Sequence, residues 1–284
     1  MAMPTLMFGL GATKAGSGWL YRYLRGHPEC HMRTVKELHF FDTLQAGRRP
    51  RRLRKLDGAI SAEARRADAG RHRALRRLGD LQELAEVTHA ATDDAYLDYL
   101  MRGRGEARLV GDITPAYALL PADWLRRMQA LAPGTRFVYL MRDPLERLWS
   151  NLRMMARRDA EESAVGPRAN RLMAEWLEGG HRDVAARGDY GAVLSRLDAA
   201  LEPARLFLGF FEELVAQPVP EALCRFLGLT PRPASANPVH EGVPATLDPE
   251  LRGRALARLA PQYDVVAARM GRLPAAWEAN LERS

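Results

Sequence analysis

The strongest constraint on the fold is a glycine-rich turn near the start of the chain, between a short apolar run and a helical pattern. The run occupies residues 5–10, and aromatic residues and leucines recur at helical spacing from Trp19. Four glycines stand in and around the turn: Gly9, Gly11, Gly16 and Gly18. This order predicts a strand, a loop and a helix. Because loop N–H groups and a helix start attract anions, we expect a phosphate or sulfate site here.

The loop departs from the nucleotide-binding pattern GxxxxGK[ST]. Within residues 11–18, GATKAGSG, the first six residues fit the first six positions of the pattern. Ser17 then stands where the lysine belongs, and the lysine of this loop is Lys14. An ATPase or GTPase needs the later lysine at its phosphates and a neighbouring hydroxyl on magnesium. We therefore expect the loop to bind an anion without metal-assisted hydrolysis.

Lysine is rare in this chain, since 39 of the 42 basic residues are arginine. Two of the three lysines, Lys14 and Lys36, fall between residues 6 and 42. Chance is one explanation. The other is that a compact ammonium is needed there, because it directs its charge at a single oxygen as a planar guanidinium does not. We favour the second explanation for Lys14.

A group of ionisable residues follows at residues 36–42, KELHFFD. In an extended segment Glu37 and His39 point to the same side, which places a potential base beside a potential proton partner. His39 titrates near neutrality, whereas Glu37 needs a raised pKa to act well as a base, so from the residues alone either is the base. Asp42 either contacts an acceptor or starts the next turn.

A second anion-binding segment is predicted after the apolar run at residues 136–141. Asp143 suits a helix cap and Pro144 a first turn. Ser150 follows Arg142 by eight residues, just over two helical turns, so both can face one phosphate. The alternative is a capped surface helix with a solvent-exposed arginine.

Strands alternating with helices predict an α/β fold: a P-loop-like, three-layer arrangement with a central parallel sheet of about five strands flanked by helices. Further strands are expected at residues 30–34, 108–113 and 205–211, and further helices at 121–131, 189–201 and 249–270. We expect one domain over residues 1–284, with a helical insertion at about 45–105 and a helical tail at about 231–284. Within the insertion, helical patterns occur at residues 65–84 and 93–101. Its basic cluster at residues 48–55 is a solvated face or guides an anionic acceptor.

Composition limits the remaining functions. No run of about 18 uncharged apolar residues predicts a membrane span, and no signal peptide is expected. Cys30 and Cys224 are expected to be free thiols in a reducing compartment, the cytoplasm. A net charge of +7 indicates anionic partners, yet no nucleic-acid-binding motif is present and no cluster has metal-ligand spacing. Oligomeric state is not indicated.

Three segments in this order resemble sulfotransferases that use 3′-phosphoadenosine 5′-phosphosulfate (PAPS), above all glycosaminoglycan-type and bacterial members. They are ATKAGSGWLYRYL, VKELHFFD and VYLMRDPLERLWSNL, and the likeness spans residues 6–229. The resemblance implies Glu37 as general base with His39 assisting, and Lys14 at the bridging oxygen. It also implies a set of donor-binding residues: Lys14, Ala15, Gly16, Ser17, Gly18 and Trp19 at the 5′-phosphosulfate, and Arg142 and Ser150 at the 3′-phosphate.

The sequence departs from the family pattern at two places. Ile113 stands where glycan sulfotransferases often carry a lysine before Thr114-Pro115, and residues 237–242 lack the lysine and arginine of a basic loop. The expected reaction is in-line sulfuryl transfer from PAPS to a hydroxyl of a carbohydrate, lipid or small metabolite, without a metal, releasing adenosine 3′,5′-bisphosphate. The alternatives are a P-loop small-molecule kinase and a non-catalytic binder of nucleotide or polyanion.

Overall fold

A parallel sheet forms the centre of the molecule in the computed structural model, which describes residues 3–68, 72–159, 161–234 and 244–282. Its strand order is β2-β3-β1-β4-β5, with every pair parallel. The strands are β1 (Thr5–Gly11), β2 (Cys30–His31), β3 (Leu109–Ile113), β4 (Thr135–Met141) and β5 (Leu206–Phe210). The predicted five-stranded parallel sheet is confirmed, although β2 is shorter than the expected strand at 30–34.

Both faces of the sheet are buried, as the apolar runs require. On β1, Leu6 and Phe8 belong to one hydrophobic cluster and Met7 to the other. Helices α1 (Ser17–Arg25) and α12 (Glu221–Leu227) contribute to the Met7 cluster. Residues of α6 (Ala122–Ala130), α7 (Pro144–Ala156) and α10 (Tyr190–Ala200) contribute to the other. The three-layer arrangement follows from this two-sided burial.

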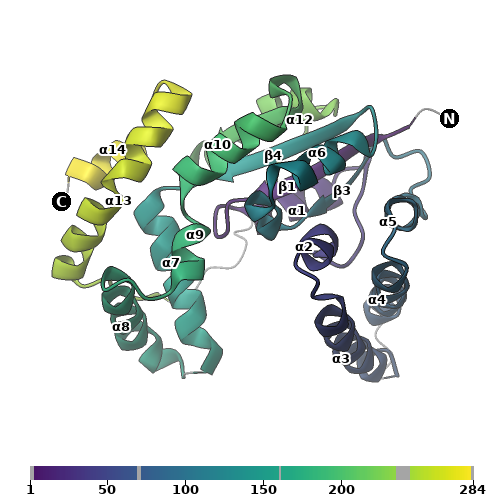
Figure 1. Ribbon diagram of the computed structural model, residues 1–284, viewed down its shortest axis with the longest axis horizontal. Coiled ribbons are helices and arrows are strands. Elements are labelled where there is room, and N and C mark those ends of the chain that lie inside the picture. The colour runs from purple at the N-terminus through teal and green to yellow at the C-terminus, as the bar shows by residue number, and fades with distance from the viewer. Residues whose placement is uncertain (1–2, 69–71, 160, 235–243, 283–284) are drawn as a thin grey trace.

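Four helices lie between β2 and β3: α2 (Phe40–Gln45), α3 (Arg49–Asp68), α4 (His72–Ala90) and α5 (Asp93–Met101). The last three fall within residues 45–105, where a helical insertion was expected. Helices α3 and α4 pack side by side to one side of the sheet (Figure 1). The pattern at residues 65–84 therefore falls across two helices, which is a correction to the single stretch that the sequence suggested. The prediction at 93–101 coincides with α5.

Two helices at the end of the chain support the region after β4. They are α13 (Pro249–Met270) and α14 (Ala275–Glu282), and α13 packs against α7, α10 and α8 (Val165–Leu177). The hydroxyl of Tyr263 donates to both carboxylate oxygens of Asp143, each at 3.1 Å. Trp277 is fully buried. Residues 237–242, the expected place of a basic loop, lie outside the described residues.

Shorter helices complete the described chain: α9 (Arg182–Ala186), α11 (Phe211–Ala216) and the 3₁₀ turns η1 (Pro115–Leu119), η2 (Arg157–Asp159), η3 (Glu162–Ala164) and η4 (Pro203–Arg205). Cys30 and Cys224 are free thiols, as expected. Within the described ranges, no helix combines the length and apolarity needed to cross a bilayer.

Candidate active site

The candidate site lies at the carboxyl edge of the sheet. Because the strands are parallel, the segments that follow β1, β3, β4 and β5 all emerge at this edge. They bring together the glycine-rich loop, Thr114, Arg142 and Phe211. Four segments far apart in the sequence thus meet at one place, as the ligand sites of open α/β sheets do.

The glycine-rich loop is held in one shape by its neighbours. Gly16 has φ +87°, and a Cβ on it would lie 2.1 Å from the ring of Phe211, so only glycine fits. The N–H of Ala12 donates to Leu140 O at 2.6 Å, which anchors the loop to β4. The N–H of Ala15 donates to Ala12 O at 3.1 Å, so this predicted donor to the 5′-phosphate is already used within the loop.

The first turn of α1 leaves N–H groups that have no acceptor within the helix. This helix begins at Ser17, so the N–H groups of Ser17, Gly18 and Trp19 belong to that turn. They lie where the sequence placed the anion site. The positive end of the helix adds to the attraction.

Lys14 and Arg142 lie next to each other. Arg142 Nη1 donates to Lys14 O at 3.4 Å, and burial followed by the charges of Arg142, Arg153 and Lys36 lowers the pKa of Lys14. Arg142 is itself fixed by Tyr190, whose hydroxyl donates to Arg142 O at 2.6 Å and accepts from Arg142 N at 3.0 Å. Two segments 128 residues apart thus present their cations to one region.

Helix α7 begins as the sequence predicted. Asp143 caps it by accepting from Glu146 N at 2.9 Å, and Pro144 occupies the first turn. Glu146 is 3.5 Å from Arg142 Nη2, and Ser150 follows one turn later and is half-buried. The 146, 150 and 153 positions share one face of a helix, which places Ser150 on the face that carries Glu146 toward Arg142.

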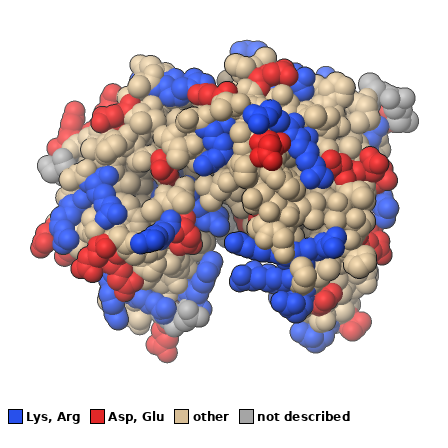
Figure 2. All heavy atoms as spheres, in the orientation of Figure 1, with Lys and Arg blue, Asp and Glu red and all other residues tan. Residues whose placement is uncertain are grey.

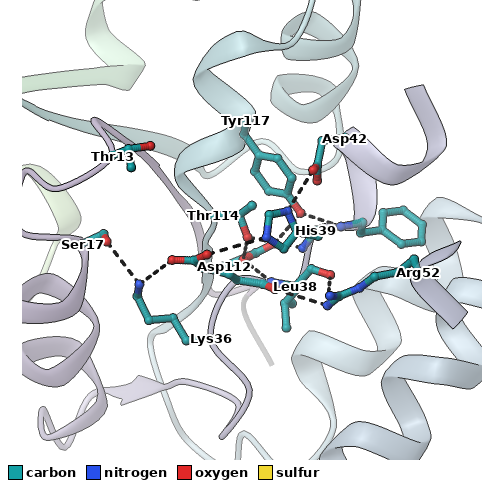
Figure 3. Close-up of polar contacts among 12 residues, drawn as sticks. Thr13, Ser17, Lys36, Leu38, His39, Asp42, Arg52, Asp112, Thr114 and Tyr117 are labelled. Atoms are coloured by element: carbon teal, nitrogen blue, oxygen red, sulfur yellow. Dashed lines mark hydrogen bonds and ion pairs between the residues drawn. The ribbon is translucent and has the colours of Figure 1, made fainter. Parts of the chain in front are cut away.

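Lys36 connects the loop with the segment that was predicted to be catalytic. Its Nζ donates to Ser17 Oγ at 3.1 Å and to Glu37 Oε1 at 2.8 Å (Figure 3). Ser17 is the position at which nucleotide-binding P-loops carry their lysine. An ammonium group is thus supplied at that position from a different part of the chain.

The expectation that residues 36–42 are extended is wrong. Glu37 has φ +61° and His39 has φ +53°, both left-handed conformations, and α2 begins at Phe40. The two side chains still meet, because His39 Nε2 lies 3.6 Å from Glu37 Oε2. On its other side His39 Nδ1 is 2.8 Å from Asp42 Oδ2 (Figure 3). Asp42 therefore both belongs to the new helix and pairs with His39.

The three side chains change each other's protonation. Burial opposes the charge on His39, but its hydrogen bonds with Asp42 and Glu37 outweigh burial and raise its pKa to about 9. Burial likewise disfavours ionised Glu37, but hydrogen bonding to His39 and the charge of Lys36 lower its pKa to about 2. At neutral pH His39 is therefore a cation, and Glu37 is the group able to accept a proton.

A buried carboxylate, which sequence reasoning missed, holds this segment in place. Asp112 on β3 is 2% exposed and accepts from Thr114 Oγ1 at 2.7 Å and from the hydroxyls of Tyr117 and Tyr96 at 2.7 and 2.9 Å. It also accepts from Leu38 N at 3.4 Å (Figure 3). Burial raises the pKa of Asp112. An acidic residue in an apolar strand was the sequence signal that could have revealed it.

The hydrogen-bond partners of Asp112, together with Arg52, also bond to the backbone of residues 37–40. The Tyr117 hydroxyl accepts from Phe40 N at 2.9 Å, and Thr114 Oγ1 accepts from His39 N at 3.4 Å. From α3, Arg52 Nη2 donates to Leu38 O at 2.8 Å and Glu37 O at 3.3 Å. The unusual backbone from residue 37 to residue 40 is thus bonded to β3, η1 and α3.

Ile113, which stands where related sequences often have lysine, is a core residue here. It is 2% exposed, and a Cβ on Gly9 would lie 2.9 Å from its side chain. A cation approaches from another element instead: Arg187, just after α9, donates from Nη1 to Thr13 Oγ1 at 3.5 Å. Sequence reasoning did not single out Arg187.

The surface beside the site is hollowed. Figure 2 shows the hollow between two lobes, which Figure 1 identifies as α3 with α4 and α7 with α8, and Lys and Arg side chains gather on both sides of it. Residues 48–55, at the start of α3, contribute six basic residues and no acidic one. Among the described residues, no group of three or more His, Cys, Asp or Glu side chains is arranged to hold a metal ion.

Comparison with known proteins identifies the family of this chain. The model of the sulfotransferase family matches residues 6–233, and the chain belongs to that family. A search of curated proteins found no match. The crystal structure of a sulfotransferase from Alicyclobacillus acidocaldarius is 22% identical, with a TM-score of 0.60 over 98% of this chain and 100% of that one.

Two other solved structures share the fold at lower similarity. The sulfotransferase domain from the curacin biosynthetic pathway is 19% identical, with a TM-score of 0.51 over 92% of this chain and 99% of that domain. The sulfotransferase domain of the Synechococcus PCC 7002 olefin synthase is 18% identical, with a TM-score of 0.51 over 91% and 96%. At these identities the likeness concerns the fold.

Proposed function

We propose that this protein transfers the sulfuryl group of PAPS to a hydroxyl group of an acceptor. The observation that supports this most is the meeting of Lys14, Glu37 and Arg142 at one edge of the sheet in a chain of the sulfotransferase family. The loop N–H groups at the start of α1 fit a 5′-phosphosulfate. Arg142 and Ser150 are the residues that we assign to the 3′-phosphate.

The proposed reaction is a single in-line displacement. The acceptor oxygen forms a bond to sulfur while the bond from sulfur to the bridging oxygen breaks, and its electron pair leaves with adenosine 3′,5′-bisphosphate. Glu37 takes the proton of the acceptor hydroxyl, and Lys14 stabilises the charge on the departing oxygen. The Glu37 side chain is 41% exposed, so an alcohol can reach its carboxylate.

A pKa of about 2 makes Glu37 a weak base while Lys36 and His39 both contact it. The negative charges of the donor, placed near Lys14 and Lys36, oppose that lowering. We therefore expect the pKa of Glu37 to be higher with a bound nucleotide than without one. His39, held by Asp42, orients Glu37 and remains protonated.

The acceptor approaches through the hollow between α3 and α7 in this proposal. Its basic walls favour an acceptor that carries negative charge, although carbohydrate, lipid and small-metabolite alcohols are all candidates. Free Cys30 and Cys224 support a reducing compartment such as the cytoplasm.

The proposal is tested by calorimetry and by a screen. Adenosine 3′,5′-bisphosphate should bind the wild-type protein without a metal, and radiolabelled PAPS should transfer its label to at least one hydroxylated acceptor in a panel of alcohols. Binding without transfer to any acceptor would favour a non-catalytic binder. Magnesium-dependent consumption of ATP, with no binding of the bisphosphate, would favour a kinase.

A further inference from the structure

One arginine inside the molecule has no counter-charge from the protein. Arg147 on α7 is 2% exposed, and its Nε and Nη1 atoms are buried without a hydrogen-bond partner. No described carboxylate forms an ion pair with it. Arg33, which is also buried, pairs instead with Asp80 and Glu83. An isolated buried cation lowers the stability of the folded protein. The charge of Arg147 therefore needs an explanation other than stability.

The surroundings of Arg147 connect it with the glycine-rich loop. Burial lowers the pKa of Arg147, and the charges of neighbouring Arg142 and Arg187 lower it further, while Tyr190 and Tyr139 act in the opposite direction. Both of these arginines reach the loop, Arg142 at Lys14 O and Arg187 at Thr13 Oγ1. Arg147 is therefore a neighbour of two cations that contact the glycine-rich loop.

The turn between α9 and α10 is shaped around this guanidinium. A Cβ on Gly188 would lie 2.0 Å from Arg147 Nη2 and 2.4 Å from its Cζ. The φ of Gly188 is not in the left-handed region, so glycine is needed here for space and not for its backbone freedom. The fold thus makes room for a buried charge that it does not neutralise.

We propose that Arg147 is an electrostatic residue of the donor site, whose buried charge is balanced by the anion that binds the glycine-rich loop. This inference rests on the proposed donor site and adds to it a buried residue next to Arg142 and Arg187. It predicts opposite effects of removing the charge: the protein without ligand becomes more stable, and the anion binds less tightly. A merely structural arginine would not separate these two quantities in this way.

The main test replaces Arg147 by methionine, in chloride buffers free of phosphate and sulfate. The melting temperature of Arg147→Met without ligand should rise by about 2–4 °C. Its affinity for adenosine 3′,5′-bisphosphate should fall by about 10- to 100-fold, as expected for one charge acting over several ångströms at an effective dielectric constant of about 20. Unchanged affinity would overturn the proposal whatever the melting temperature does.

A second variant, Gly188→Ala, keeps the charge of Arg147 but changes its position. Gly188→Ala must displace the guanidinium of Arg147, so it should also weaken binding of the bisphosphate, whereas Gly191→Ala, whose Cβ would have no atom nearer than 3.5 Å, should not. If Arg147→Met loses both affinity and stability, bisphosphate binding by Gly188→Ala is the deciding measurement. Weaker binding by Gly188→Ala than by wild type supports the proposal, and equal binding overturns it. The matched arginine control, Arg33→Met, should lower the melting temperature and leave affinity unchanged.

Failure of the proposed function gives a different result. If the wild-type protein does not bind the bisphosphate but is stabilised by inorganic pyrophosphate, and Arg147→Met loses that stabilisation, the donor is misassigned and the role of Arg147 stands. If the wild-type protein binds neither probe, the role of Arg147 is overturned together with the anion site.

Discussion

The two halves of the candidate site balance their charges in different ways. In the proposed catalytic segment, residues 36–42, Lys36 pairs with Glu37, and His39 lies between Glu37 and Asp42. In the proposed donor half, four cations gather from different places in the chain: Lys14, Arg142, Arg147 and Arg187. Among the described residues, Glu146 is the carboxylate that forms an ion pair with this group, at Arg142.

Under the proposed function, this difference suits each half to a separate role. A segment whose charges are already paired keeps its protonation states and geometry before any ligand arrives, as a positioned base requires. A group of like charges is unfavourable by itself and becomes favourable when an anion enters it. Substitutions in the first half should therefore change turnover, and substitutions in the second should change nucleotide affinity.

The largest expected effect is on turnover and comes from the paired half. Glu37→Gln removes the proposed base, so the turnover number should fall by about 10²- to 10⁴-fold while the affinity for adenosine 3′,5′-bisphosphate changes little. Initial rates with radiolabelled PAPS and calorimetry measure the two quantities. Glu86→Gln, at an exposed position on α4, is the control. Wild-type turnover in Glu37→Gln would remove Glu37 from the mechanism.

The next effect belongs to the donor half. Arg142→Ala removes a cation and its charge-assisted hydrogen bonds, so calorimetry should show an affinity for the bisphosphate about 10- to 100-fold weaker. Arg126→Ala, an exposed arginine that donates to Ala199 O, should bind like the wild-type protein. Equal affinity of Arg142→Ala and wild type would mean that the 3′-phosphate binds elsewhere.

A smaller effect tests how the catalytic segment is held. Asp112→Asn replaces a carboxylate that accepts several hydrogen bonds by an amide, whose NH2 group must face one of the surrounding donors. The free energy of unfolding should therefore fall by about 1–3 kcal/mol. Turnover should fall more than nucleotide affinity, because the network bonds to residues 38–40 and not to the loop. Chemical denaturation, with Tyr96→Phe as the milder comparison, checks this. An equal loss of affinity and turnover would contradict it.

Removing the link between the two halves should move a pKa. Lys36→Met deletes a cation that lowers the pKa of Glu37, so that pKa should rise from about 2 toward its usual value near 4.5. Carbon-detected NMR of the labelled carboxyl group reports it directly, and the acid limb of the pH–rate profile should move the same way. Lys55→Met, on α3, should leave both unchanged. A pKa of Glu37 that stays at 2 would show that His39 alone sets it.

The smallest effect is a pH dependence of stability. His39 has a pKa raised from 6.5 to about 9 in the folded protein, so its contribution is fully present below pH 6.5 and is lost as the pH rises to about 9. The difference in free energy of unfolding between wild type and His39→Asn should shrink over that interval. Denaturant titrations at several pH values measure it. A difference that grows with pH would mean that His39 is neutral in the fold.

The sequence by itself determined the parallel sheet, the position of the glycine-rich loop and the capped helix after β4. These features depend on neighbouring residues: apolar runs that fit buried strands, glycines that fit a tight turn, and Asp143 before Pro144. The same local signals placed α5 and α13. The sequence also singled out Lys14 by the rarity of lysine, Glu37 and His39 by their spacing, and Arg142 by its place after a predicted strand. The resemblance to sulfotransferases implied roles for all four.

Only the tertiary structure decided how these residues meet. The left-handed backbone at Glu37 and His39 is held by Asp112, Thr114, Tyr117 and Arg52, which are distant in the sequence and leave no local pattern. The extended segment was the reasonable local prediction, and long-range hydrogen bonds overrode it. In the same way, nothing in the local sequence distinguishes Arg147 from the other helical arginines. Its burial without a counter-charge exists only once α7, α9 and α10 are packed around it.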